Sequence, residues 1–296
     1  SCHVINLEYL LKMVRAFLIL LPLLSMIGAT KVPLRLDFGV YPSDRATVMY
    51  RKFTPVLEAI RIPLENQLGR EVDIHLKIFE NYETGLKSLA KGEVDFVRFG
   101  PASYILVEQQ NEDVQLLAME LRKGLKRFNG LIITRADSGI NSIEDLRGRS
   151  FAFGDSNSTI GTFLAQSLLL KHGINEEALD RFDHLDRHDL VARAVINGSH
   201  DAGALKPSTY KKLCDPKEIV VIEAFENVTK PWVASSKLSK EICNAITQSL
   251  LMLEDPEVIG ELGCSGFSES NPEEYDLVRK GMQHAADFKK TADEEE

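Results

Sequence analysis

The sequence predicts an α/β protein built from two α/β domains, with a ligand cleft between them. Apolar runs of strand length alternate along the chain with segments of helical periodicity, which is typical of βαβ units around a mostly parallel sheet. The alternation begins afresh near residue 129, so we expect each half to have its own sheet. A chain of 296 residues has room for two domains of ordinary size.

The apolar pattern of the first half of the sequence predicts three strands and three helices in alternation. The second strand is the clearest, because Val72, Ile74, Leu76 and Ile78 alternate with polar residues. Glycines close the first two helices, and a Gly-Pro pair ends the third strand. The predicted elements are a strand at 33–40, a helix at 54–68, a strand at 72–79, a helix at 82–91, a strand at 94–99 and a helix at 102–110.

The second half continues the same alternation and then ends in helices. The predicted elements are a strand at 131–134, a short helix at 142–146, a strand at 151–153, a helix at 160–172, an extended segment at 180–185, a helix at 188–197, strands at 201–205, 220–224 and 232–235, and helices at 240–253 and 272–289.

The order of these elements predicts two chain crossings between the domains, near 125–130 and near 225–230. The second unit looks complete without the last helices, so we expect those helices to pack elsewhere. The first lobe is then residues 33–127 together with 228–292, and the second lobe is residues 128–227. Two crossings make a hinge, and a cleft between two α/β domains is a common ligand site.

Residues 1–29 have the organisation of a secretory signal peptide. Lys12 and Arg15 precede an apolar stretch at 16–24, and small residues follow it. The apolar stretch is shorter than the ~20 residues of a comfortable membrane span, although an uncleaved anchor is the alternative. The true start could be Met13, with residues 1–12 derived from upstream sequence. The signal peptide predicts export and a periplasmic location.

Composition excludes some classes of partner and leaves one question about the cysteines. Charged residues are 27% and hydrophobic residues 44%, an ordinary soluble balance, and the net charge of −9 argues against nucleic acid. After residue 29 the cysteines are Cys214, Cys243 and Cys264, so an exported chain would keep at least one free thiol. Cys243 and Cys264 could pair across the C-terminal helices. No pair has metal-ligand spacing, so no metal is expected.

The segment 150–163 carries the strongest functional signal in the sequence. A short apolar strand ends at Gly154, small polar residues follow, and helical periodicity begins at Ile160. The loop therefore presents the hydroxyls of Ser158 and Thr159, with unpaired backbone N–H groups, at a helix N-terminus that suits a phosphate-like anion. An ordinary helix cap is the alternative. The loop has neither the P-loop ending nor the GxGxxG of a dinucleotide site, so nucleotide binding is not indicated.

Seven short segments of the chain occur in the order that one known family has them. They are 81–83, 99–104, 135–140, 153–161, 188–189, 201–204 and 231–233. Through these segments the chain, from about residue 36 to residue 270, resembles the periplasmic phosphonate/phosphite/phosphate-binding proteins of ABC transporters, which have the type II periplasmic binding fold. The resemblance implies two lobes joined by two crossover strands, with the ligand between them.

The resemblance also implies roles for individual residues. In the family the Ser-Thr loop holds the oxyanion, which falls on Ser158 and Thr159, and the matching histidine is His188. Here Asp-Arg precedes the histidine where the family has Gly-Ser, which puts its placement in question. Taken alone, His188 is more typical of an exposed residue at a helix start.

Three aromatic residues complete the implied site. Tyr82 matches the family's pocket aromatic and could donate to an oxyanion, although by itself it is equally typical of a half-buried helix residue. Phe99, before the Gly-Pro pair, could form a wall of the pocket but cannot donate. Tyr41 ends the first strand at the same edge of the sheet, where a turn tyrosine is the simpler interpretation.

Two lysines mark the main departure from the family. Members that bind an aminoalkyl phosphonate hold its ammonium with carboxylates, and the matching neighbourhoods here contain Lys206 and Lys230. Either lysine could point into water, as most lysines do. If one of them faces the cleft, we expect an ammonium-bearing ligand to be disfavoured and a more highly charged oxyanion to be favoured.

These observations predict a monomeric solute-binding protein that captures phosphonate, phosphite or phosphate and passes it to a membrane permease, without a cofactor. One alternative is an exported phosphoester hydrolase, but Ser158 has no base evident in the sequence and no catalytic residues are predicted. The other alternative is the ligand-sensing subunit of a signalling system, which would need a separate partner protein.

Overall fold

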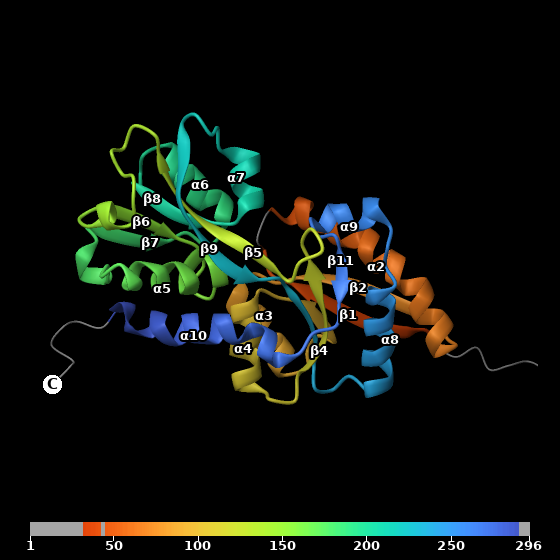
Figure 1. Cartoon of the computed structure of the whole chain (residues 1–296). Coiled ribbons are helices and arrows are strands. Elements are labelled where there is room, and N and C mark those ends of the chain that lie inside the picture. Colours follow the sequence, from red (N-terminus) through yellow and green to blue (C-terminus); the bar gives the residue numbers. More distant parts are fainter. Residues whose placement is uncertain (1–31, 43–44, 290–296) are drawn as a thin grey trace, which may run out of the picture.

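The structure, a computed structural model, describes residues 32–42 and 45–289 and contains two β-sheets with helices packed on them (Figure 1). This confirms the predicted α/β class with a sheet in each half. The predicted signal peptide lies outside the described residues. Within 32–42 and 45–289, no helix has both the length and the apolarity that a bilayer crossing requires.

The first sheet has six strands in the order β11-β4-β10-β3-β1-β2. Its strands are β1 (Leu34–Val40), β2 (Val72–Ile78), β3 (Phe96–Arg98), β4 (Gln115–Leu121), β10 (Pro231–Ala234) and β11 (Gly266–Ser268). The helices of this part are α2 (Ala46–Leu68), α3 (Tyr82–Ala90), α4 (Pro101–Gln110), α8 (Lys240–Leu251) and α9 (Pro256–Leu262).

The second sheet has five strands in the order β7-β6-β8-β5-β9. Its strands are β5 (Arg127–Arg135), β6 (Ser150–Phe153), β7 (Arg181–His184), β8 (Ala202–Leu205) and β9 (Ile219–Val228). The helices between them are α5 (Leu164–Lys171), α6 (His188–Ile196) and α7 (Pro207–Leu213), and α10 (Asp276–Ala285) comes last.

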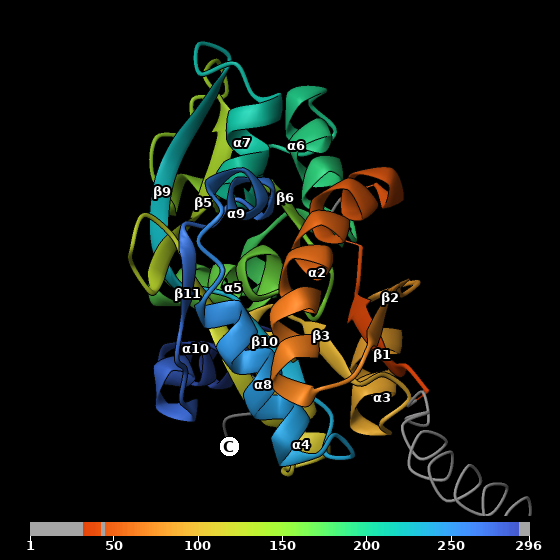
Figure 2. The ribbon, with the colours of Figure 1, turned by 90° about the vertical axis from the view of Figure 1, so that its right-hand side faces the viewer.

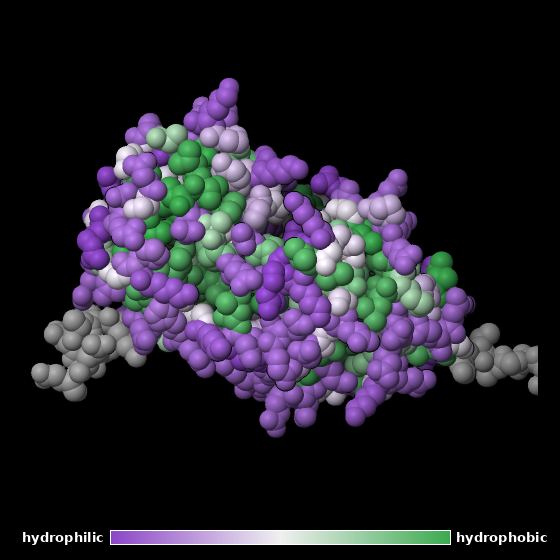
Figure 3. All heavy atoms as spheres, viewed as in Figure 1, coloured by the Kyte–Doolittle hydropathy of each residue, from purple (hydrophilic) through white to green (hydrophobic). Residues whose placement is uncertain are grey.

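Figure 3 shows a largely hydrophilic face with apolar side chains gathered along β5 and β9.

Both sheets are mixed, so the prediction of mostly parallel sheets was wrong. β1 pairs in parallel with β2 and β3, and β6 pairs in parallel with β7 and β8. Every pair that involves β4, β5, β9 or β10 is antiparallel. The chain passes from β4 of the first sheet into β5 of the second, and it returns from β9 of the second sheet into β10 of the first. These four strands that join the sheets are antiparallel to the strands beside them.

The two crossings lie side by side where the sequence places them. The chain passes from β4 to β5 through residues 122–126 and from β9 to β10 through residues 229–230. The backbone N–H of Thr229 donates to the Lys126 carbonyl over 3.0 Å, and the Thr229 hydroxyl donates to the same oxygen over 3.2 Å. The crossings are therefore hydrogen-bonded to each other.

Several elements differ from the sequence-based prediction. α2 begins at Ala46 rather than 54, because the helical spacing of its buried residues reaches back through Phe53 to Met49. β4, α7, α9 and β11 were not predicted. β4 has buried residues on consecutive positions and so no alternation, while α7 and α9 are helices of only seven residues each, both with proline at the start. All three described cysteines are free thiols, so Cys243 and Cys264 are not paired.

The last helix contacts both units, so the expectation that it would pack elsewhere than on the second unit is met only in part. α10 runs along α5 (Figure 1), and Arg279 of α10 forms an ion pair with Glu108 of α4 in the first unit. The contact is close because residue 281 is glycine: a Cβ there would lie 2.4 Å from Leu164 Cδ2. Beyond α10, the ring of Phe288 packs edge-on against Phe153 of β6 at 5.5 Å. The chain therefore returns to the second unit after completing the first sheet.

We expect Phe288→Ala to destabilise the protein by about 3 kcal/mol, because it removes a fully buried aromatic ring that joins the chain's end to β6 and β7. Tyr50→Ala is the matched control, since Tyr50 is 52% exposed and its loss should cost under about 0.5 kcal/mol. Urea denaturation of the two variants measures the difference. Equal stabilities would show that the segment after α10 contributes nothing to the second unit.

Candidate functional site

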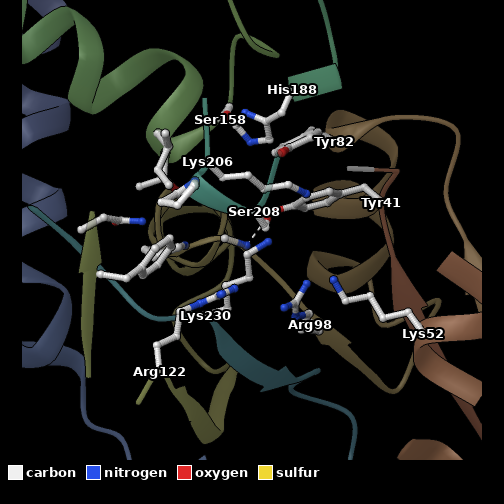
Figure 4. Close-up of a pocket in the computed structure, with 17 residues that line it drawn as sticks. Tyr41, Lys52, Tyr82, Arg98, Arg122, Ser158, His188, Lys206, Ser208 and Lys230 are labelled. Carbon is white, nitrogen blue, oxygen red and sulfur yellow. Dashed lines mark hydrogen bonds between the residues drawn. The ribbon is translucent and has the colours of Figure 1, made fainter. Parts of the chain in front are cut away.

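A small cavity lies between the two sheets, where parallel strands of both end (Figure 4). Its volume is about 40 Å³, which corresponds to roughly three water molecules. Such a space suits a ligand of a few heavy atoms. Seventeen residues line it: Tyr41, Lys52, Tyr82, Arg98, Gly100, Pro101, Arg122, Phe128, Ser158, Thr159, Ile160, His188, Lys206, Pro207, Ser208, Asn227 and Lys230.

Five helical segments begin at residues that line this cavity. α3 begins at Tyr82, α4 at Pro101, the π-helical turn that leads into α5 at Thr159, α6 at His188 and α7 at Pro207. Each of them follows a parallel strand, so the strand-to-helix turns of both sheets meet at one place. A helix N-terminus carries partial positive charge and unpaired N–H groups. The backbone alone therefore makes this cavity favourable for an anion.

The charged side chains of the lining all have the same sign. Five lining residues are cationic, and none of the described lining residues is an aspartate or glutamate. The five are Lys52, Arg98, Arg122, Lys206 and Lys230. Because like charges repel strongly where water is scarce, this arrangement calls for a bound anion.

Arg98 is held at the cavity wall by a buried ion pair with Glu120 of β4. Its Nε donates to Glu120 Oε1 over 2.6 Å and its Nη2 donates to Oε2 over 2.8 Å. Trp232 Nε1 also donates to Oε1, over 3.3 Å. Burial on its own would raise the pKa of Glu120, but the charge and hydrogen bonds of Arg98 outweigh burial and hold this pKa at about 2. Glu120 therefore stays ionised and fixes the guanidinium in place.

Lys206 and Lys230, which replace the carboxylates expected from the resemblance, both line the cavity. Figure 4 shows their side chains reaching into the same space. Burial and the charges of Arg98 and Lys206 lower the pKa of Lys230 well below its ordinary value, and Glu120 opposes this shift only in part. Of the two alternatives that the sequence left open, the structure has both lysines at the cavity rather than in water.

His188 and Asn227 present buried polar atoms without partners. His188 is buried at the start of α6 rather than exposed, and its Nδ1 has no hydrogen-bond partner among the described residues. Asn227 Oδ1 is likewise buried without a hydrogen-bond partner among the described residues. Burial, together with Lys206 and Lys230, lowers the pKa of His188 well below its ordinary value, so the ring is neutral. An unsatisfied buried polar atom costs about 1–3 kcal/mol, which a bound molecule could offset.

The Ser-Thr loop accepts backbone hydrogen bonds through both of its hydroxyl oxygens. Ser158 Oγ accepts the Gly161 N–H over 3.1 Å, and Thr159 Oγ1 accepts the Ala102 N–H of α4 over 2.9 Å. A hydroxyl that accepts in this way can still donate its own hydrogen, and the Ser158 hydroxyl also interacts with the Tyr82 phenol. The loop is tightly folded, since a Cβ on Gly161 would lie 2.8 Å from Gly154 Cα. Capping and anion binding are thus compatible in the same two residues.

Two stacked tyrosines form one side of the cavity. The rings of Tyr41 and Tyr82 lie 3.6 Å apart at 21°. The Gly100 N–H donates to the Tyr41 hydroxyl over 2.5 Å. Burial raises the pKa of Tyr41 to about 12 and that of Tyr82 well above its ordinary value, so both phenols keep their protons. Phe99 does not line the cavity: it lies behind Tyr41, with ring centroids 5.3 Å apart.

The structure thus brings together seven of the eight residues chosen from the sequence, all except Phe99. Sequence reasoning missed Lys52, Arg98, Arg122, Ser208 and Asn227. Arg122 and Asn227 lie next to the predicted crossings, a position that could have identified them. Lys52 had no signal, because nothing in the sequence brings the first turns of α2 to a loop in the other half.

The model of the periplasmic substrate-binding protein of phosphonate ABC transporters matches residues 38–275. The chain belongs to this family. It is 23% identical over 181 residues to the phosphate-import protein PhnD of Mycolicibacterium smegmatis, covering 58% of this chain and 54% of that protein. The chain therefore matches about half the length of this curated relative.

Two solved structures show the same fold. PhnD1 of Prochlorococcus marinus, in complex with methylphosphonate, has a TM-score of 0.74 at 20% identity, covering 85% of this chain and 98% of that one. A binding protein component of a Pseudomonas aeruginosa phosphonate transporter has a TM-score of 0.73 at 19% identity, covering 89% and 92%. The fold is therefore that of the type II periplasmic binding proteins.

The lowered pKa of Lys230 predicts that anion binding takes up a proton. An anion in the cavity offsets the repulsion from Arg98 and Lys206, so the pKa of Lys230 rises on binding and the protonated form is favoured in the complex. Affinity for phosphite should then fall as the pH rises through the alkaline range, from the lowered pKa of Lys230 in the free protein to its higher pKa in the complex, by up to about tenfold per pH unit. Calorimetric titrations across this range measure the slope.

Lys230→Arg tests the assignment, because an arginine stays charged throughout this range and should flatten the profile. Lys240→Arg, on the exposed start of α8, is the control and should leave the slope unchanged. An unchanged slope in Lys230→Arg would assign the effect to another group.

Proposed function

We propose that this chain is the solute-binding component of an ABC transporter, that it captures a small phosphorus oxyanion without an amino group, and that it delivers this ligand to a membrane permease. The observation that carries the proposal is the charge of the cavity: five cations, no acid among the described lining residues, and converging helix N-termini. The family supports the transport role, and the volume of about 40 Å³ supports a ligand such as phosphate, phosphite or methylphosphonate.

Two lobes are part of the proposal. The first comprises the described residues up to the first crossing, with the segment from β10 to β11, and the second comprises β5 to β9 with α10. Lining residues come from both: Tyr82 and Arg98 from one, and Ser158, His188 and Lys206 from the other. A ligand between them would hold the lobes together. We further propose export to the periplasm and action as a monomer.

Phosphoester hydrolysis is supported less well. Ser158 Oγ accepts the Gly161 amide, and the side chain that interacts with it is Tyr82, a phenol that keeps its proton. A seryl nucleophile would need a base in that position. Within residues 32–42 and 45–289, no cluster of three or more candidate ligands could hold a metal ion. The ligand-sensing subunit of a signalling system would bind its ligand in the same way. Such a subunit would differ from a transport protein in its partner protein and not in its binding site.

Removing the loop hydroxyls should abolish binding with little loss of structure. Charge-assisted hydrogen bonds contribute on the order of 1.5–3 kcal/mol each, so Ser158→Ala with Thr159→Val should weaken binding of methylphosphonate and phosphate by ~100-fold or more. Calorimetry measures the affinities. Thr159→Ser, which keeps a hydroxyl for the Ala102 amide, should retain binding within about tenfold.

Ser239→Ala is the matched control for the loss of the cap. Ser239 caps α8 as Ser158 caps its own helix, but it lies outside the cavity. Ser158→Ala and Ser239→Ala should each lose about 1 kcal/mol of stability, and only Ser158→Ala should lose affinity. Unchanged affinity of the loop variants for every phosphorus oxyanion would reject this loop as the binding site.

The second test addresses the ligand. Titrated side by side, phosphate, phosphite and methylphosphonate should each bind at least about tenfold more tightly than 2-aminoethylphosphonate, because Lys206 and Lys230 repel its ammonium. Lys206→Glu combined with Lys230→Asp should shift the preference towards the amino compound. Lys217→Asp with Lys240→Glu makes the same change of charge at exposed positions and should not. Tightest binding of 2-aminoethylphosphonate by the wild type would overturn the role of the lysines.

A further inference from the structure

A second and much larger cavity adjoins the first. Its volume is about 430 Å³, against about 40 Å³ for the small cavity, and the two share Lys52, Lys206 and Ser208 as walls. It lies among the beginning of α2, α6, α7 and α9, which come together in the upper part of Figure 2. Elements of both halves of the chain form this cavity, as they form the small one.

The larger cavity is also strongly basic, in a chain whose net charge is −9. Six of its thirteen lining residues are cationic: Arg45, Arg51, Lys52, Arg193, Lys206 and Lys212. Its two acids are Asp189 and Glu261, and Asp189 already accepts Arg187 Nε over 2.9 Å. Cations gathered in one groove repel one another and do not help the chain to fold, so their clustering favours an anionic occupant.

We propose that the physiological ligand carries a second anionic group, a carboxylate or a second phosphoryl group on a short chain, and that this group occupies the larger cavity while the phosphorus headgroup sits in the small one. The inference rests on the proposed function. The small cavity has room for the headgroup alone, and a substituent that leaves it past Lys52 and Lys206 enters a space lined by four further cations.

This arrangement differs from general attraction of anions by the basic groove. Attraction at long range would favour every anion according to its total charge, wherever on the ligand that charge lies. A second binding position stabilises only ligands that place a charge there, and it lengthens their residence. The two possibilities therefore predict different dependences on the length of the chain between the two charges.

The test compares 3-phosphonopropionate with propylphosphonate, which has a similar chain without the carboxylate, and uses methylphosphonate as the headgroup alone. Calorimetry on the wild type should show roughly tenfold tighter binding of 3-phosphonopropionate than of propylphosphonate. Phosphonoacetate and 4-phosphonobutyrate extend the series and identify the best chain length.

Arg51→Gln combined with Arg193→Gln removes two cations that line only the larger cavity, and it should reduce the tenfold preference to about twofold while methylphosphonate binds within about twofold of wild type. Lys217→Gln with Lys240→Gln removes the same net charge from exposed positions and should preserve the preference. Equal binding of 3-phosphonopropionate and propylphosphonate by the wild type would overturn the inference. Equal weakening of all three ligands in the arginine variant would also overturn it. Failure of methylphosphonate and phosphate to bind would instead reject the proposed function.

Discussion

The repulsion among cations around a small cavity is the constraint on which the rest of this site depends. Lys230 shows its strength, since Arg98 and Lys206 together with burial lower its pKa well below that of a free lysine. The protein tolerates this repulsion because the charge of Arg98 is paired with that of Glu120, and because the cavity lies between the two sheets rather than within the core of either. Among the described lining residues of this cavity there is no aspartate or glutamate.

The same constraint explains why the site lies between the two sheets. A single strand-to-helix turn offers one helix N-terminus and one or two side chains. One such turn therefore cannot provide the five helix starts and five cationic side chains that surround this cavity. The ends of the parallel strands of both sheets provide the five helix starts, and the two crossings add Arg122 and Lys230. The hydrogen bond from Ala102 to Thr159 joins the two sets of turns directly, so the loop that would donate to the ligand also links the two halves.

The sequence predicted local structure well and long-range packing less well, for physical reasons. The loop at Ser158 and Thr159 was recognisable because strand, cap and helix are encoded within about a dozen neighbouring residues. Lys206 and Lys230 were noticed because they replace residues expected from the resemblance. The packing of α10 on α5 depends on a glycine that fits one particular leucine, and the position of Lys52 depends on how two distant halves meet. Neither fact is expressed in any local pattern.

A cavity of one charge sign selects ligands by charge before it selects them by shape. Neutral His188 and the protonated phenols of Tyr41 and Tyr82 can then fix the orientation of an anion that the lysines and arginines have already favoured. The carboxylate of Glu120 has both oxygens bonded to Arg98, so it is not available to hold an ammonium group. The proposed discrimination against amino-bearing compounds therefore rests in part on the same ion pair that keeps Arg98 in position.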